Sequence, residues 1–252
     1  MIDLHSHILP GVDDGVGSLA EACALAIAAR YAGVTAIAAT PHVRLDYPTT
    51  PAEMEAGVAA VRGALAEASI RLDVLTGGEI DLGRLPSLAR EDVERFTLAG
   101  TGRYLLLEFP DQGWPLSLEL AIHGLKRDGI TAVLAHPERN DAVQDRPARL
   151  EAAVEAGAVV QVTTGSLAGV LGRTAQATAK RLLKLGLVHL LASDVHHPDS
   201  RVLGAAAAAE TIRDDALVRY LTEESPYAIV VGDELPPLEP PRRRRRLLPL
   251  GR

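Results

Sequence analysis

Short apolar runs alternate with longer amphipathic stretches along almost the whole chain. The short runs indicate buried strands, and apolar residues that recur every three or four positions indicate helices. The predicted strands are Met1–Leu4, Val34–Ala39, Leu72–Leu75, Tyr104–Glu108, Thr131–Ala135, Ala158–Thr163 and Val188–Ala192. The predicted helices are residues 18–32, Pro51–Ala68, Leu116–Asp128, Pro147–Ala156, Thr174–Leu185 and Val202–Asp214.

Local signals mark where these helices begin and end. Ser18 and Glu21 have the spacing of a capping box, and Gly33 stands where that helix is expected to end. Glycines also precede three later strands, at Gly129, Gly157 and Gly186. Strands that alternate with helices predict βαβ units and a parallel sheet. Seven strands with this rhythm predict an α/β fold that closes into a (βα)7 TIM-like barrel rather than an open sheet.

The domain organisation is expected to be simple. No linker is apparent before about residue 235, so we expect a single barrel domain over residues 1–234. The remaining residues, 235–252, form a proline- and arginine-rich tail that we expect to be disordered. Its five consecutive arginines, Arg242–Arg246, could instead make weak contact with an anionic membrane surface.

Composition narrows the class of protein. Hydrophobic residues make up 47% of the chain, which is typical of a globular protein, and no apolar run is long enough to span a membrane. The N-terminus lacks the charged and apolar regions of a signal peptide, and the single cysteine fits a reducing compartment. We therefore expect a cytoplasmic protein. The net charge of −7 argues against a nucleic-acid partner.

Potential metal ligands follow most of the predicted strands. In a βα barrel, the carboxyl ends of the strands face one common site. Because six strands deliver such residues to this end, the sequence predicts one shared site. These residues are His5, His7, Asp13 and Asp14 after the first strand, His42 after the second, Glu79 after the third, Glu108 at the end of the fourth, His136 after the fifth, and Asp194 and His196 after the seventh.

The spacing within these groups favours metal binding. Side chains alternate along a strand, so His5 and His7 point to the same face and can bind one ion. Asp194 and His196 have the same spacing, and closure of the barrel would bring them beside the first pair. Mixed imidazole and carboxylate ligands suit zinc, manganese or iron. Any one of these residues alone would more simply be a hydrogen-bonded polar residue, but five of eight histidines lie at this end.

A set of short motifs runs in order through residues 1–232. They are MIDLHSH at 1–7, DDG at 13–15, TPH at 40–42, GEI at 78–80, LEF at 107–109, AHPER at 135–139 and ASDVH at 192–196. In these motifs the chain resembles the PHP (polymerase and histidinol phosphatase) superfamily. It resembles most closely the bacterial capsule-type, metal-dependent protein tyrosine phosphatases of that superfamily.

The resemblance implies a distorted (βα)7 barrel that holds three divalent metal ions, typically manganese, with iron, zinc or magnesium as alternatives. It implies that His5, His7, Glu79 and Asp194 bind the first ion, and that Glu79 bridges to a second ion held by Glu108 and His136. Asp14, His42 and His196 would bind the third. Arg139 and Arg201 would bind the substrate phosphate, and His42 or His196 could assist catalysis.

The implied function is hydrolysis of phosphotyrosine by a metal-activated hydroxide. The implied partner is a bacterial tyrosine kinase with a tyrosine-rich tail that regulates capsular or exopolysaccharide synthesis. No Cys-x5-Arg loop is present, so a cysteinyl-phosphate mechanism is excluded. Three alternatives stay open: a small-molecule phosphatase such as histidinol phosphatase, a PHP-type nuclease, and a metal-bound regulatory module without turnover.

Overall fold

The computed structural model describes residues 1–200 and 203–237 as an α/β fold with short parallel strands. The strands are β1 (Ile2–Asp3), β2 (Ala36–Ala38), β3 (His42–Val43), β4 (Asp73–Leu75), β5 (Glu79–Asp81), β6 (Tyr104–Glu108), β7 (Thr131–Leu134), β8 (Val159–Thr163) and β9 (Leu190–Ala192). The helices are α1 (Leu19–Tyr31), α2 (Pro51–Glu67), α3 (Arg90–Arg95), α4 (Leu118–Arg127), α5 (Asp141–Asp145), α6 (Leu150–Glu155), α7 (Thr164–Ala168), α8 (Arg173–Leu185), α9 (Ala206–Ile212), α10 (Asp215–Arg219) and α11 (Ser225–Val231).

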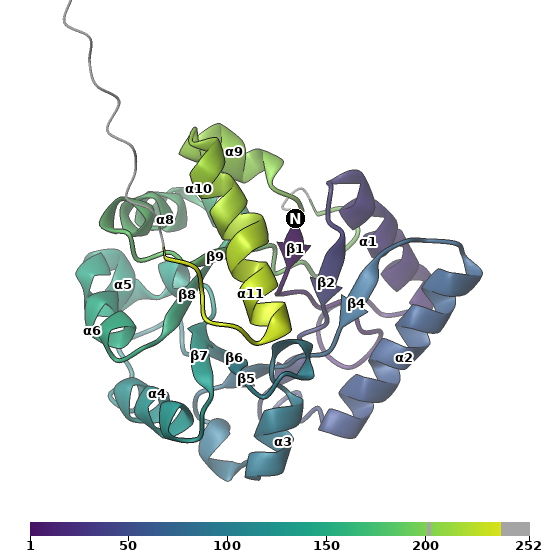
Figure 1. Cartoon of the computed structure of the whole chain (residues 1–252), viewed down its shortest axis with the longest axis horizontal. Helices are drawn as coiled ribbons and strands as arrows, with labels where there is room; N and C mark the ends of the chain where they lie inside the picture. The colour runs from purple at the N-terminus through teal and green to yellow at the C-terminus, as the bar shows by residue number, and fades with distance from the viewer. Residues whose placement is uncertain (201–202, 238–252) are drawn as a thin grey trace, which may run out of the picture.

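The strands form two sheets that are joined into one curled parallel sheet. Their orders are β1-β2-β4 and β3-β5-β6-β7-β8-β9. The amide of His7 donates to the carbonyl of Val195 at 2.9 Å, which links the chain after β1 to the chain after β9. Thr40 lies in the chain between β2 and β3, and its amide donates to the carbonyl of Ser6, after β1, at 2.9 Å. Figure 1 shows the strands in the middle of the molecule, with most of the helices around them.

The predicted α/β class, with parallel strands in one domain, is confirmed, but the strand count differs from seven. Two predicted βα units each contain two short strands, β2 with β3 and β4 with β5. Pro41 has no amide hydrogen to donate to the ladder, and Gly77 and Gly78 offer no side chain to pack, so both paths are interrupted. The helices α3, α5, α7, α10 and α11 were not predicted, because five to seven residues are too few for a helical period to show.

Two hydrophobic clusters lie on the two faces of the curled sheet. Along β6, Leu105 and Leu107 belong to the larger cluster under the surrounding helices, and Tyr104 and Leu106 belong to the smaller one. This alternation follows from the strand period of two. Ile229 of α11 joins the smaller cluster, and the hydroxyl of Tyr104, at the start of β6, donates to the carbonyl of Asp233 at 2.6 Å. The chain around α11 therefore covers the amino ends of the strands, and Figure 1 shows α10 and α11 crossing in front of them.

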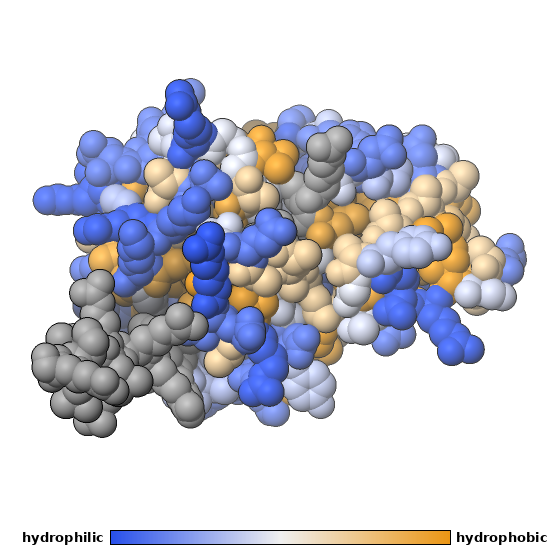
Figure 2. Space-filling view, turned by 90° about the horizontal axis from the view of Figure 1, so that it is seen from above, coloured by the Kyte–Doolittle hydropathy of each residue, from blue (hydrophilic) through white to orange (hydrophobic). Residues whose placement is uncertain are grey.

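The visible surface of the protein is mixed in polarity. In Figure 2, hydrophilic side chains cover much of the visible face, with apolar areas between them. None of the helices within residues 1–200 and 203–237 is long and apolar enough to cross a membrane. Most of the predicted tail, including Arg242–Arg246, lies outside the described residues.

Gly78 offers a test of how tightly the chain packs beside β5. A Cβ atom at this position would lie 2.5 Å from Cδ1 of the fully buried Phe96, so Gly78→Ala should lower the free energy of unfolding by about 1–3 kcal/mol. Gly63 is exposed in the middle of α2 with open space around it, so Gly63→Ala should raise this free energy by about 0.5–1 kcal/mol. Urea unfolding of both variants measures the difference. An unchanged midpoint for Gly78→Ala would contradict the packing described here.

Candidate metal centre

The structure brings all nine predicted metal-ligating residues together. Most follow or end a strand, whereas His42 and Glu79 are the first residues of β3 and β5, just beyond the carboxyl ends of β2 and β4. Four overlapping groups of side chains each have their ligand atoms within 4.8 Å of one another. The groups are His5, His7 and Asp194; His5, Glu79 and His136; His42, Glu79 and Glu108; and His7, Asp14, His42 and His196. Because the groups share members, they form one continuous cluster, which we call the ligand cluster.

Glu79 lies at the centre of the ligand cluster. Its side chain is fully buried, and four imidazoles contact its two oxygens. Oε1 lies 3.0 Å from Nε2 of His136 and 3.3 Å from Nε2 of His5. Oε2 lies 2.9 Å from Nδ1 of His42 and 3.5 Å from Nε2 of His7. A carboxylate whose two oxygens each face two imidazoles can bridge two cations.

Asp194 closes the inner side of the cluster. Its Oδ1 atom lies 3.1 Å from Nε2 of His5 and 3.2 Å from Nε2 of His7. An isolated parallel β-bridge between Ser6 and Val195 holds the chain after β9 beside the chain after β1. This contact places Asp194 next to His5 and His7. Residues from opposite ends of the sequence therefore share one ligand group.

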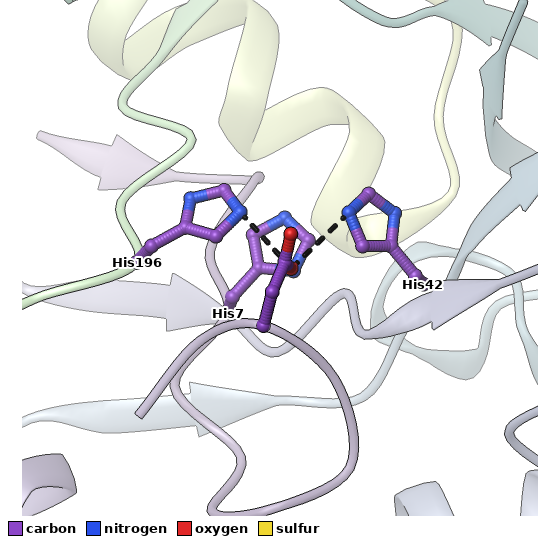
Figure 3. Close-up of side chains that lie close together, drawn as sticks. His7, His42 and His196 are labelled. Carbon is purple, nitrogen blue, oxygen red and sulfur yellow. Dashed lines mark ion pairs between the residues drawn. The ribbon is translucent and has the colours of Figure 1, made fainter. Parts of the chain in front are cut away.

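Asp14, His42 and His196 form the outer side of the cluster. Oδ1 of Asp14 lies 3.5 Å from Nε2 of His42 and 3.4 Å from Nε2 of His196. Figure 3 shows the imidazoles of His7, His42 and His196 around an unlabelled carboxylate, with dashed lines that correspond to these two ion pairs. The side chain of Asp14 is 44% exposed and that of His196 is 28% exposed, whereas His5 and His7 are buried. A substrate would therefore meet the outer group first.

Two residues outside the nine predicted ligands orient imidazoles of the cluster: Asp13, which the sequence placed near the site, and Gln161, which it did not. Oε1 of Gln161, on β8, lies 3.1 Å from Nδ1 of His5, and Oδ2 of Asp13 lies 2.8 Å from Nδ1 of His7. Each contact occupies one ring nitrogen and leaves Nε2 facing the cluster, which is how ligating histidines are commonly held. The adjacent pair Asp13 and Asp14 was a visible signal for the second contact. Gln161 gave no signal, because it lies inside a buried strand.

The electrostatics of the cluster couple its acids to its histidines. Burial raises the pKa of Glu79, but the charge of His5, the hydrogen bond from His136 and the nearby imidazole of His42 outweigh it, so the pKa lies well below the usual range. Burial lowers the pKa of His7, but the contacts with Asp13 and Asp194 outweigh it and raise the pKa to about 9. The pKa of His5 is likewise raised by Glu79 and Asp194 against burial. Protons on these imidazoles therefore compensate the buried carboxylates when no cation does.

Two ligand residues have left-handed backbone conformations. His136 has φ 34° and ψ 50°, and Asp194 has φ 54°. Residues other than glycine in this region cost of order 1–3 kcal/mol, and they concentrate at functional sites. At each position the chain turns sharply after a buried strand, β7 or β9, and aims the side chain across the end of the sheet.

Arginine side chains flank the ligand cluster on two sides. Nη2 of Arg139 contacts Oδ2 of Asp194, so this predicted phosphate-binding residue lies against the cluster. Arg201, the other predicted phosphate-binding residue, lies outside the described residues. Arg44 was missed. Its Nη1 atom lies 3.9 Å from Oε2 of Glu108. The signal that could have found it is its position two residues after His42, because residues two apart lie on the same face of a strand.

The donor atoms fit a metal centre. Nδ1 of His42 and Oε2 of Glu79 are buried and lie 2.9 Å apart, yet neither has a hydrogen-bond partner of acceptable geometry among the described residues. Buried polar atoms are rarely left in this state, and a cation shared by the two lone pairs would satisfy both. The combination of imidazole and carboxylate donors suits manganese, iron and zinc.

Comparison with known proteins finds a family and close relatives for this chain. A family sequence model described as "Capsular polysaccharide synthesis, CpsB/CapC" matches residues 1–224. Tyrosine-protein phosphatase YwqE of Bacillus subtilis is 34% identical over 238 residues, which are 93% of this chain and 91% of YwqE. Tyrosine-protein phosphatase CpsB of Streptococcus pneumoniae is 31% identical over 207 residues, which are 80% of this chain and 85% of CpsB.

A solved structure agrees as well. It comes from crystal structures of YwqE from Bacillus subtilis and CpsB from Streptococcus pneumoniae, described as unique metal-dependent tyrosine phosphatases. It matches with a TM-score of 0.84 and 33% identity, over 93% of this chain and 96% of that one. The curled parallel sheet and its ligand cluster thus define a metal-dependent α/β enzyme. Within that class, the chain belongs to the capsular polysaccharide synthesis family CpsB/CapC.

Metal binding should release protons from this site. At pH 7.5 the metal-free protein retains the proton of His7, whose pKa is about 9, and a metal ion must displace it. We expect release of at least one proton per molecule, and an apparent affinity that rises with pH until about 9. Calorimetric titration of chelator-treated protein with Mn²⁺, in buffers of different ionisation enthalpy, measures the release. His123→Ala, on the exposed face of α4, is the control and should release as many protons as the parent. Binding without proton release would contradict the assignment.

Proposed function

We propose that the chain is a metal-dependent protein-tyrosine phosphatase that hydrolyses phosphotyrosine. The observation that carries the proposal is the buried carboxylate of Glu79 within a cluster of nine side chains that could bind metal ions. The names of the relatives point to the same activity, because YwqE and CpsB are both tyrosine-protein phosphatases. We further propose that the strands count as seven units of a distorted (βα)7 barrel over residues 1–234, since β2 with β3 and β4 with β5 each occupy one βα unit.

Three divalent ions, most simply manganese, would occupy the ligand cluster. His5, His7, Glu79 and Asp194 would hold the first, Glu79, Glu108 and His136 the second, and Asp14, His42 and His196 the third. The contacts of 2.9–3.5 Å between Glu79 and four imidazoles support the sharing of this carboxylate between two ions. When bound, such ions supply a nucleophile at neutral pH and stabilise charge on a phosphoryl group.

The chain's own residues would orient the phosphate. Arg139 contacts Asp194 on one side of the cluster, and Arg44 approaches Glu108 on another. Guanidinium groups present planar sets of donors that match phosphate oxygens, so both can hold a phosphate placed over the cluster. Arg201 stays a prediction for the same role. The leaving phenolate has a pKa of about 10, so it needs little help from an acid, and His42 or His196 at the outer side could provide that help.

The proposed partner is a phosphotyrosine protein, most simply a bacterial tyrosine kinase with a tyrosine-rich tail that regulates capsular or exopolysaccharide synthesis. The description of the family supports this context. A cytoplasmic location is proposed with it. A small-molecule phosphatase such as histidinol phosphatase is the alternative within the same chemistry. A nuclease is disfavoured by the net charge of −7.

His136→Ala and Arg139→Ala should separate the metal site from the phosphate clamp. Removal of His136 takes away one of the imidazoles beside Glu79 and Glu108 and leaves the second ion with too few ligands, so both bound manganese and turnover should be lost. Removal of Arg139 should preserve the metal content but lower kcat by about 10²–10³, as for the loss of one donor to transition-state charge. Arg139→Lys should recover little, because a point charge does not replace a planar fork.

The measurement combines metal content and kcat on the same preparations, with a phosphotyrosine peptide, histidinol phosphate and single-stranded DNA as parallel substrates. His123→Ala should match the parent in both quantities, since its side chain is exposed on α4. Full activity of His136→Ala, or faster turnover of histidinol phosphate than of the peptide by the parent, would refute the proposal.

A further inference from the structure

A polar cavity adjoins the ligand cluster at Arg139. It has a volume of about 360 Å³ and lies between the turn after β7 and the start of α8. Arg139 lines this cavity and also contacts Asp194 in the cluster. The cavity and the proposed phosphate position therefore share the Arg139 side chain.

The charge of the cavity has one sign. Its charged lining side chains are Arg139 and Arg173, and no carboxylate lines it within the described residues. Arg173 makes no hydrogen bond or ion pair within the part of the chain that the structure describes. The buried Nε atom of Arg139 also has no hydrogen-bond partner there. Arg173 is exposed to solvent, whereas the unpartnered Nε of Arg139 is buried. A buried donor without a partner, beside a second arginine and with no carboxylate among the described lining residues, indicates a place for an external anion.

The walls of the cavity are held in place by contacts within the protein. The side-chain Nε2 of Gln144 donates to the carbonyls of Glu138 and Arg139, both at 3.1 Å, and so fixes the turn that carries Arg139. Leu171, which is 44% exposed, adds an apolar edge on the opposite wall. The turn that carries Arg139 is therefore held in place before a ligand binds, so this part of the wall loses little conformational entropy on binding.

We propose that this cavity is a subsite for a second anionic group of the substrate, on a residue close in sequence to the phosphotyrosine. The inference rests on the proposed phosphatase function. Arg173 would bind the anionic group of the substrate residue as a planar donor, and Leu171 would contact the aliphatic part of that substrate side chain. A carboxylate of aspartate or glutamate and a second phosphate share the required chemistry. The enzyme would thus prefer tyrosines in acidic or multiply phosphorylated segments.

The test uses the manganese-loaded full chain and phosphotyrosine peptides in which one glutamate is moved through the two positions on each side of the phosphotyrosine. The reference substrates are an all-alanine peptide and phenyl phosphate, which has no neighbouring residue. We expect at least one glutamate position to raise kcat/KM above that of the alanine peptide. Arg173→Ala should lower kcat/KM for that peptide about tenfold and leave kcat/KM for phenyl phosphate unchanged. Arg181→Ala, exposed on the same helix, is the matched control and should change neither.

A further peptide, with a second phosphotyrosine at the preferred position, distinguishes the two sources of the anion. The group whose peptide loses more kcat/KM in Arg173→Ala, glutamate or phosphotyrosine, is the preferred occupant of the subsite. Arg173→Lys should keep part of the preference for that peptide over the alanine peptide. If no glutamate or phosphotyrosine position raises kcat/KM, or if Arg173→Ala lowers all substrates equally, the subsite is wrong while the phosphatase function stands. If the parent hydrolyses neither phenyl phosphate nor any peptide, the phosphatase function itself is wrong.

Discussion

The burial of one carboxylate is the constraint on which the rest of the site depends. Glu79 is removed from water on β5, and an uncompensated buried carboxylate costs several kcal/mol. Four imidazoles from three different chain segments contact it, so the carboxyl ends of the strands must converge for the fold to tolerate it. Protons or cations can provide the opposing charge. The same geometry that makes the charge tolerable therefore prepares the site to exchange protons for metal.

The inner and outer sides of the cluster differ in how they are held. The inner residues follow buried strands, and the orientations of His5 and His7 are fixed by Gln161 and Asp13. The outer residues Asp14 and His196 come from loops and are partly exposed. Because the chain around α11 covers the amino ends of the strands, the outer loops form the accessible side of the cluster. Rigid strands thus hold the charge, while loops offer the surface on which substrates can be distinguished.

The sequence was informative wherever function and periodicity coincide. Each predicted ligand follows an apolar run, so the strand ends located the cluster without knowledge of the tertiary structure. The interruptions at Pro41 and at Gly77 were visible as residues, but their effect on strand pairing depends on neighbouring strands. The contact between His5 and Gln161 joins residues 156 positions apart, and no local pattern encodes it. Arg44 was within reach, since the alternation that paired His5 with His7 applies equally to His42 and Arg44.

The left-handed backbone at His136 and Asp194 sets stability against function. Glycine would adopt either conformation without strain, and it would also remove a charged or polar side chain from a crowded, buried cluster. Variants selected only for resistance to heat would therefore tend to accumulate changes at these two positions and lose the site while they keep the fold. Engineering for thermal stability would need to screen activity in every round, because two residues with strained backbone conformations belong to the ligand cluster.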